Sequence, residues 1–587
     1  MSNPSGLISS QIIKESPQHQ ASSTSMSTTR RRSRCSTGVS LVATAIISSA
    51  GAFQLQSDGF LHQSKSAATY FRGTRSTAGL RIASVSPPSS PDIPTKTDEL
   101  TIVGDLPKLY SSESFDWFKA WYPIVPVEYL DVEKPHAFKL LGMDMVIWND
   151  GPVDSNPTFQ PRKDRAKDAK KSEGQWRVFI DECPHRKVPL SEGRIEDDGS
   201  LLCSYHGWRF NGRGETIDIP QIPPSELERI KANPKSNCNS FPVQVKDGIL
   251  WVWPDASDDA RIESALAPVP TNNYEGEDID EDRLWLGPWN FRELPYGHDY
   301  FIENVVDPAH VPVSHHNVVG SRYSNQSLHL ETLQPLTKAG FSIGVKTALA
   351  TSDMSSTTTF HAPSQVLIKQ PFGKESARQY LELYSSPSRP GFSNHVGRMV
   401  VVKDTSKTMP NALRQFTFPM PIWVNHVLTS LFLNQDALFL HGQERTFTHT
   451  GKYRTAVPAN DSYSKNVLPT SADKGVMLFR GWMSKYAHGF IPFQGDTTMT
   501  ASNKEVVFDV WNAHTKNCKY CLAALKRIKT VRTLTFFASA LVATIRPKVL
   551  GTAGSTLAAL GLSGLGLVLS KLIGMFYRFE FSHAENH

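Results

Sequence analysis

Short runs of aromatic and β-branched residues, each closed by glycine, proline or aspartate, mark the chain between Ser114 and about residue 275. Such runs with turn residues between them are typical of short β-strands. The pattern therefore predicts a small β-domain over 110–275. A polar, basic segment at 156–174 interrupts it and is expected to be a long surface excursion. The expected strands are Trp117–Tyr122, Phe138–Trp148, Trp176–Ile180 and Gly248–Trp253.

The pattern changes again beyond Lys529, where the chain becomes apolar. The uncharged stretch Val549–Ser570 is long enough to span a membrane, since a helix rises about 1.5 Å per residue. Thr533–Ile545 is shorter, and its flanking arginines would have to extend toward the membrane surface. With Pro547 between the stretches, the sequence predicts a transmembrane helical hairpin over 531–577. Several glycines would allow the two helices to approach closely: 551, 554, 561, 564 and 566.

The first 95 residues do not show the pattern of a folded domain. Residues 1–95 are rich in Ser, Thr and Arg and almost free of acid, which is the composition of a transit peptide. Within them, the apolar run Val39–Ile47 leads to Ala50-Gly51-Ala52, a small-x-small cleavage pattern. This order resembles the bipartite presequence of algae whose plastids are enclosed by extra membranes. The alternative is a disordered leader with one chance apolar run.

Composition narrows the classes of protein further. With 587 residues and 39% hydrophobic content, the chain can form several cores. A formal net charge of +6 is small for this length and predicts no nucleic-acid partner. Six cysteines are too few for a disulfide framework. Four of them form two pairs, Cys183 with Cys203 and Cys518 with Cys521.

The first cysteine pair is combined with histidines, as Cys183-x-His185 and Cys203-x-x-His206, with a tight turn expected at Asp198-Gly199. In a Rieske-type 2Fe–2S cluster, cysteines hold one iron and histidines hold the other. Tetrahedral zinc can use the same four ligands, but zinc loops usually keep at least two residues between paired ligands. The single residue between Cys183 and His185 therefore favours the cluster.

A second candidate metal site lies in the segment 303–316, where Asp307, His310 and His315 read D-x-x-H-x-x-x-x-H. If this segment is roughly helical around a kink at Pro312, both imidazoles can reach one metal ion. Two histidines and one carboxylate form the facial triad of non-haem Fe(II) oxygenases. The sequence therefore predicts a mononuclear iron site.

Two neighbouring residues bear on this site. His316 is an alternative to His315, but the four-residue gap after His310 favours His315. Asn304, two turns before His310, can reach the open side of the iron, although it is also an ordinary polar residue of a helix.

Three strings together resemble pheophorbide a oxygenase and its plastid relatives: CSYHGWRFNGRGE, GILWVWP and ELPYGHDYFIENVVDPAHVP. The relatives include chlorophyllide a oxygenase, protochlorophyllide oxygenases and the Rieske protein of the inner-envelope translocon. The resemblance covers about 114–521. It implies an α+β fold, with an N-terminal all-β Rieske domain, a helix-grip catalytic domain with a large antiparallel sheet over 285–515, and C-terminal membrane helices.

The resemblance also points to the third iron ligand. Asp436 lies in a segment, 434–440, that resembles the late helix from which these oxygenases supply a carboxylate. Glu444 and Asp404 are weaker candidates. A 2Fe–2S cluster, a mononuclear Fe(II), ferredoxin as electron donor and a tetrapyrrole substrate are implied as well.

We therefore expect a Rieske oxygenase anchored in a plastid membrane, thylakoid or inner envelope, that acts on a chlorophyll derivative, first of all pheophorbide a. Oxidation of chlorophyllide a or protochlorophyllide, or hydroxylation of a phyllobilin, are alternatives within the enzyme class. Outside it, a redox-sensing partner of the import machinery is the competing hypothesis. Such a sensor needs no catalytic iron, so the presence of His310, His315 and Asp436 favours the enzyme.

The second cysteine pair, Cys518-Lys519-Tyr520-Cys521, follows His514 and resembles the C-x-x-C near the carboxy terminus of pheophorbide a oxygenase and the translocon protein. Over 516–530 we expect a redox segment, because a C-x-x-C can form a reversible disulfide with a lowered thiol pKa. A structural zinc would need a fourth ligand beyond His514 and the two cysteines. Two unpaired thiols near a membrane are the remaining alternative.

Oxygenases of this kind form rings in which the cluster of one subunit abuts the iron of the next, and a cyclic homotrimer is the state implied here. The matching residue is Asp307, whose carboxylate could hydrogen-bond His310 and also the partner subunit's His185 or the partner subunit's His206. The alternative is that Asp307 caps the helix that follows it.

Overall fold

The computed structural model describes most of the chain beyond residue 114. The expected presequence at 1–95 and nearly all of the polar insertion at 156–174 lie outside the described residues. The described ranges are 114–151, 174–271, 279, 281–318, 321–324, 327–347, 356–371, 377–414, 417–447, 466–496, 498–499, 503–545 and 547–583.

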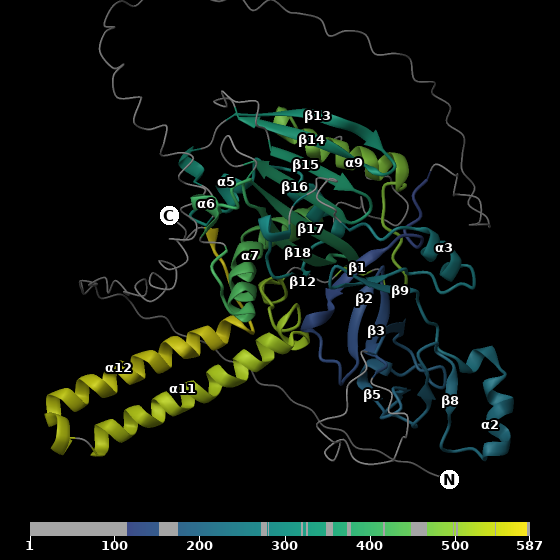
Figure 1. The fold of residues 1–587 in the computed structure, drawn as a ribbon, viewed down its shortest axis with the longest axis horizontal. Coiled ribbons are helices and arrows are strands. Elements are labelled where there is room, and N and C mark those ends of the chain that lie inside the picture. The colour runs from purple at the N-terminus through teal and green to yellow at the C-terminus, as the bar shows by residue number, and fades with distance from the viewer. Residues whose placement is uncertain are drawn as a thin grey trace, which may run out of the picture. The chain divides into compact units, whose positions relative to one another are not determined.

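Three small antiparallel sheets form the first half of the described chain, in the orders β1-β10-β9, β2-β3-β4 and β5-β6-β7-β8 (Figure 1). Gly199, with φ 77°, makes the expected turn before β6. The strands are β1 Tyr122–Pro126, β2 His136–Leu140, β3 Met143–Asn149, β4 Trp176–Ile180, β5 Arg194–Ile195, β6 Leu201–Leu202, β7 Arg209–Phe210, β8 Thr216–Asp218, β9 Val243–Lys246 and β10 Ile249–Val252.

Two of the expected strands were wrong in their extent. The run 138–148 is a hairpin, because Leu141 and Gly142 turn the chain with φ of 52° and 83°. A Cβ at Gly142 would lie 2.1 Å from the Gln494 carbonyl oxygen, so only glycine fits this turn. In the run 117–122, only Tyr122 belongs to a strand. Trp117 and Trp121 are buried and pack into the core from a loop, and Phe118 is partly buried against the same core.

One large antiparallel sheet forms the second half, in the order β11-β18-β17-β16-β15-β14-β13, with β12 also paired to β18. The expected large antiparallel sheet is therefore confirmed. Its strands are β11 Leu284–Leu286, β12 Asn290–Leu294, β13 Leu328–Thr337, β14 Gly340–Thr347, β15 Ser356–His361, β16 Gln365–Pro371, β17 Arg378–Arg389 and β18 Phe392–Val402.

Several helices pack against this sheet. Helix α9 packs against β13 and β14, α4 against β17 and β18, and α7 against β12 (Figure 1). The helices are α2 Pro224–Lys231, α3 Ala260–Leu266, α4 His298–Val305, α5 Val311–Ser314, α6 Asn411–Arg414, α7 Ile422–Phe447, α9 Lys474–Tyr486, α10 Lys504–Val507, α11 Lys519–Ile545 and α12 Pro547–Met575.

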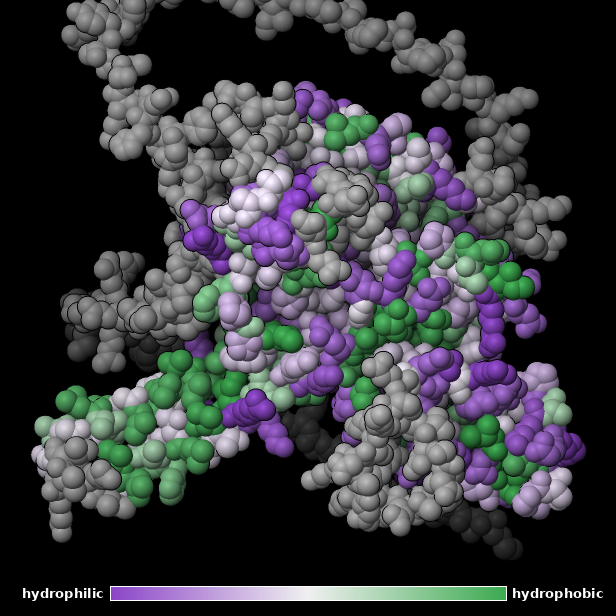
Figure 2. Space-filling view, in the orientation of Figure 1, coloured by the Kyte–Doolittle hydropathy of each residue, from purple (hydrophilic) through white to green (hydrophobic). Residues whose placement is uncertain are grey.

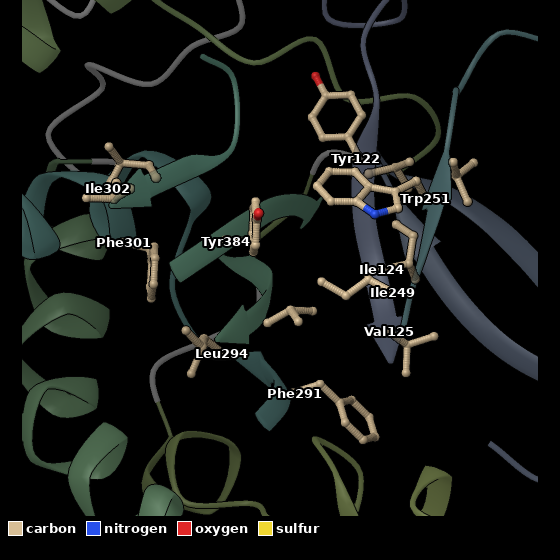
Figure 3. Packing of buried hydrophobic residues seen from close by; sticks show 14 of the residues in the cluster. Tyr122, Ile124, Val125, Ile249, Trp251, Phe291, Leu294, Phe301, Ile302 and Tyr384 are labelled. Atoms are coloured by element: carbon tan, nitrogen blue, oxygen red, sulfur yellow. The ribbon is translucent and has the colours of Figure 1, made fainter. Parts of the chain in front are cut away.

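The two halves share one hydrophobic core, in which side chains of β1 and β10 face those of the large sheet and α4 (Figure 3). The Trp251 ring meets the Tyr384 ring edge-on, with centroids 5.3 Å apart. Ser386 Oγ donates a hydrogen bond to the Pro123 carbonyl at 2.7 Å. Because such interiors are close-packed, these contacts fix the β1-β10-β9 sheet on the large sheet.

Helices α11 and α12 run side by side as a hairpin (Figure 1). Ser539 Oγ donates to the Ala559 carbonyl at 2.7 Å, and a Cβ at Gly566 would lie 2.7 Å from the Phe536 ring. The expected close approach therefore occurs at Gly566, whereas nothing lies within 4 Å of a Cβ at Gly551, Gly561 or Gly564.

Among the described helices, α12 alone is long and apolar enough to cross a membrane, over Gly551–Met575. Only 11% of its most apolar window is buried. Figure 2 shows hydrophobic side chains along the surface of the hairpin. Exposed examples are Leu534, Phe537, Leu557, Leu560 and Leu567.

After α12 the chain returns to the half that contains the large sheet. The Phe579 carbonyl accepts a hydrogen bond from Asn434 Nδ2 at 2.5 Å, and His583 Nε2 lies 2.6 Å from the Gln435 carbonyl oxygen. Residues 576–583 therefore contact α7 and belong to the fold of the domain that the sequence had predicted to end at 515.

Candidate iron sites

Two loops with the same backbone hydrogen bonds carry Cys183 and Cys203. In each loop, the N–H of the fourth residue after the cysteine donates to the cysteine carbonyl, at 2.8 Å from Lys187 and 2.9 Å from Gly207. In each, the cysteine N–H donates to the carbonyl of the fifth residue at 2.8 Å. The fourth residue has a positive φ in both loops, 59° and 75°. The two loops therefore have the same backbone conformation around their cysteines.

The thiols of these loops are buried and the imidazoles lie near the surface. Cys183 and Cys203 are each 1% exposed, while the rings of His185 and His206 lie 4.6 Å apart, and His185 stacks on Trp208. Burial raises the pKa of Cys183 to about 12, so a bound cation is needed to keep this thiol ionised. Thiols inside and imidazoles outside fit a cluster in which each iron takes one pair.

This geometry does not fit a single zinc ion at the two loops. Tetrahedral zinc would bring its ligand atoms within about 4 Å of one another. Within the described residues, these four side chains supply no set of three ligand atoms that all lie within 4.8 Å of one another.

Helices α5 and α7 bring the other predicted ligands together. His310 and His315 flank α5, and Asp436 lies in α7; their ligand atoms all lie within 4.8 Å of one another. The Asp436 Oδ2 atom is 3.1 Å from His315 Nε2 and 3.8 Å from His310 Nε2. Pro312 stands in the first turn of α5, where it loses no helical hydrogen bond, so the expected kink is absent.

The charge of Asp436 is held by donors around it. Burial raises its pKa, but the hydrogen bond from His315, the charges of both histidines and the hydrogen bond from Ser314 Oγ together lower it to about 2. Asn304 Nδ2 also donates to Asp436 Oδ2, at 3.2 Å. Two histidines and an ionised carboxylate are the donor set of a non-haem iron site.

Each imidazole is oriented through its second ring nitrogen. His315 Nδ1 lies 3.0 Å from Gln435 Oε1, and the ring stacks on Phe432 with centroids 4.0 Å apart. His310 Nδ1 lies 2.5 Å from the main-chain oxygen of Asp307. Such partners fix the tautomer and the direction of metal-binding histidines.

The side chain of Asp307 does not make the hydrogen bond that the sequence suggested. Its Oδ2 lies 3.9 Å from His310 Nδ1, which is too long for a hydrogen bond. Its Oδ1 accepts from the Ala309 N–H at 2.8 Å instead. Burial raises the pKa of this carboxyl, and its side chain is still 30% exposed.

The weaker ligand candidates lie in other surroundings. His316 Nδ1 accepts from the Arg322 N–H at 3.2 Å. Glu444 Oε2 accepts from the Gly297 N–H at 2.8 Å, and Asp404 Oδ1 accepts from the Thr408 N–H at 2.9 Å. None of these three joins His310 and His315 in the group that Asp436 completes, in which all ligand atoms lie within 4.8 Å of one another.

The C-x-x-C has two histidine neighbours. Cys518 and Cys521 are 0% and 1% exposed and are not bridged to each other. His514 and His426 complete a compact group with them. The hydrogen bond from Cys521 is the largest effect on Cys518 and lowers its pKa to about 2, while the pKa of Cys521 is raised.

Sequence reasoning missed Gln435, Ser314 and His426. The first two directly precede a predicted ligand, so their position was a usable signal. His426 stands 88 residues before its partner His514 and had no such signal.

Two family descriptions match the chain: the Rieske 2Fe–2S domain over residues 120–242 and pheophorbide a oxygenase over 360–453. The chloroplastic pheophorbide a oxygenase of Oryza sativa subsp. japonica is 30% identical over 492 residues, which cover 80% of this chain and 84% of the relative. The chain belongs to the pheophorbide a oxygenase family. It is a Rieske-type oxygenase, and its Rieske domain implies a 2Fe–2S cluster.

Other relatives differ in what their names describe. Flavonoid 8-hydroxylase 2 of Ocimum basilicum is 27% identical and covers 85% of this chain and 89% of the relative. Protochlorophyllide-dependent translocon component 52 of Arabidopsis thaliana is 26% identical and covers 72% of this chain and 76% of the relative. The names of these relatives therefore describe more than one substrate and role.

Proposed function

We propose that this oxygenase acts in a plastid on a chlorophyll-derived tetrapyrrole, with pheophorbide a as the first candidate. The observation that carries the proposal is the 30% identity over 84% of a relative named chloroplastic pheophorbide a oxygenase. The match to that family over 360–453 includes Asp436, the carboxylate that faces His310 and His315.

In this proposal Cys183, His185, Cys203 and His206 hold the cluster, and His310, His315 and Asp436 hold an Fe(II). When bound, the cluster supplies single electrons and the iron activates dioxygen.

In this proposal the surrounding residues orient the iron ligands and keep the carboxylate ligand charged. The main-chain oxygen of Asp307 and the side chain of Gln435 aim the imidazoles of His310 and His315. Ser314 and Asn304 keep the Asp436 carboxylate ionised and in place. Asn304 is the polar side chain placed to contact a molecule bound beside the iron.

Electrons are proposed to come from ferredoxin to the cluster and to pass between subunits of a homotrimer. The partial exposure of the Asp307 carboxylate supports a bridging role, since it can still accept a hydrogen bond from the partner subunit. The hairpin of α11 and α12 is proposed to anchor the enzyme in the thylakoid or inner-envelope membrane, and the length and exposure of α12 support this. A bipartite presequence would fit a plastid of the complex algal type.

The test is turnover of the full chain in detergent, with ferredoxin, its reductase and isotopically labelled dioxygen. Pheophorbide a, chlorophyllide a, protochlorophyllide, a phyllobilin and a flavone are supplied separately, and product mass reports incorporated oxygen. We expect incorporation into pheophorbide a. Incorporation into the flavone alone would contradict the tetrapyrrole proposal and point to the hydroxylase-like role of the Ocimum relative.

A matched variant separates catalysis from the cluster. Asp436→Ala should abolish turnover while the Rieske spectrum is kept. A full-length protein with both metal sites loaded and no turnover of any tetrapyrrole would instead favour the translocon-associated redox role.

A further inference from the structure

Four buried side chains outside both iron sites converge on one point. The four residues are His426 in α7, His514, and the two cysteines at the start of α11, Cys518 and Cys521. Each is at most 4% exposed, and their ligand atoms all lie within 4.8 Å of one another. His426 Nδ1 is 3.0 Å from His514 Nε2. The Cys521 Sγ atom is 3.3 Å from His514 Nε2 and 3.4 Å from His426 Nδ1.

The outer ring nitrogens of both histidines are already committed to backbone carbonyls. His514 Nδ1 lies 2.7 Å from the Phe291 oxygen, and His426 Nε2 lies 3.2 Å from the Trp289 oxygen. A carbonyl only accepts, so each of these nitrogens carries the proton of a neutral ring. The inner nitrogens, His514 Nε2 and His426 Nδ1, are therefore lone pairs that face each other with no proton between them.

A cation bound between the four ligand atoms would accept both nitrogen lone pairs and so remove the repulsion between them. We propose that His426, His514, Cys518 and Cys521 bind one zinc ion. Zinc–nitrogen bonds of about 2.0 Å and zinc–sulfur bonds of about 2.3 Å put tetrahedral N···N and N···S pairs about 3.3 and about 3.5 Å apart. The observed N···N separation is 3.0 Å, and the N···S separations run from 3.3 to 3.6 Å.

The ligand types and their closure point to a structural site. Two thiolates neutralise a divalent zinc, so the buried group carries no net charge, whereas an imidazolium–thiolate pair would bury two separate ions. The set S₂N₂ is typical of zinc, and four protein ligands leave no position for a substrate. The N···S distances are too short for the ligands of a dinuclear cluster, whose thiols and imidazoles bind different irons.

The site would tie the carboxy-terminal hairpin to the iron-binding helix. His426 lies ten residues before Asp436 in α7, about 15 Å along the helix axis. Cys518 directly precedes α11, and Cys521 lies in its first turn. One zinc ion therefore joins the helix that carries an iron ligand to the helix that begins the proposed anchor.

Metal analysis of the full-length protein tests the assignment. After dialysis against a chelator, the purified chain should hold about one zinc beside about three irons. X-ray absorption at the zinc edge should show two sulfur and two nitrogen ligands. A chain with no retained zinc, or zinc with oxygen ligands, would overturn the proposal. So would a Cys518–Cys521 disulfide found by peptide mass in protein purified with a reductant.

A matched pair of variants on α7 supplies the control. His426→Asn should lose at least nine-tenths of the zinc and keep the Rieske spectrum. His441→Asn also removes a fully buried histidine of α7 that contacts a backbone carbonyl, here of Pro295 at 2.7 Å, and should keep the zinc. If both variants are insoluble, the X-ray absorption spectrum of the wild-type chain at the zinc edge is the sole test of the ligand set. Equal zinc in both soluble variants would exclude His426 as a ligand.

Discussion

The Oε1 atom of Gln435 lies 3.0 Å from Nδ1 of His315. Because an amide oxygen only accepts, this contact places a ring proton on Nδ1 and leaves Nε2, on the Asp436 side, as the nitrogen available to a metal ion. Two adjacent residues of α7, Gln435 and Asp436, therefore act on opposite edges of one imidazole.

Removal of that amide should weaken iron binding without touching any ligand. For Gln435→Ala we expect a fall in iron affinity of about 10- to 100-fold, because His315 loses the group that fixes its tautomer. Iron content and the affinity for added Fe(II) measure the effect, with the cluster spectrum as an internal standard. Gln443→Ala, on the same helix but bonded to Glu303, is the control. Equal iron affinity in both variants would contradict the role.

Asp307→Asn distinguishes a bridge between subunits from a local cap. Asparagine can still accept the Ala309 N–H through its side-chain oxygen, so the fold and both metal sites should be retained. If the carboxylate carries the electron route, reoxidation of the reduced cluster in the presence of substrate and oxygen should slow at least tenfold. Stopped-flow absorbance measures this rate. Unchanged reoxidation, or an active monomer, would remove the inter-subunit route.

Glu444 should make stability fall as pH rises. Burial, reinforced by the nearby Asp299 carboxylate, raises its pKa to about 8, from 4.5 for an ordinary glutamate. The folded protein thus holds a proton that the unfolded chain releases, so the stability that Glu444 contributes is greatest below pH 4.5 and is lost as pH rises through 8. The slope is at most about 1.4 kcal/mol per pH unit.

Glu444→Gln should remove this slope and raise the melting temperature more at about pH 8 than at about pH 5. The exposed Glu226→Gln on α2 should change neither value. An equal melting shift for Glu444→Gln at both pH values would show that the carboxyl is not protonated in the folded state.

Because residues 576–583 contact α7, we expect two deletions of the helical hairpin to differ in their effect on iron binding. A chain ending at residue 530 loses 576–583, whose contacts hold Asn434 and Gln435. We expect that chain to bind iron poorly. A chain in which a short linker replaces 533–570 should be released from the membrane and keep its iron, since Lys529 and Tyr577 already touch at 2.7 Å. Equal iron content in the two chains would contradict a role for the tail.

Local spacing was enough to predict the segments that carry the candidate metal ligands. The pairs around Cys183 and Cys203, and the gap between His310 and His315, can be read from the sequence because each pair lies on one turn. Asp436 needed a resemblance, since 121 residues separate it from His315 and no periodicity links them.

Features set by tertiary packing could not be predicted. The run 117–122 has strand composition, yet most of it finds no partner strand and fills the core from a loop. The place of His426 depends on how α7 crosses the start of α11, which no local pattern encodes. The same holds for the tail beyond α12, whose hydrogen bonds join residues about 145 positions apart.

The core shared between the β1-β10-β9 sheet and the large sheet limits how chimeras can be built. A donor Rieske domain exchanged at the family boundary, residues 120–242, would replace β1 while leaving its partner strand β10 behind. The boundary between donor and recipient residues would then lie within a close-packed interior. An exchange of 136–242 keeps β1 with β10, so that the cluster module can be swapped as an insert rather than as a terminal domain, provided that the donor keeps side chains equivalent to Leu140, Met145 and Ile147, which belong to the same core.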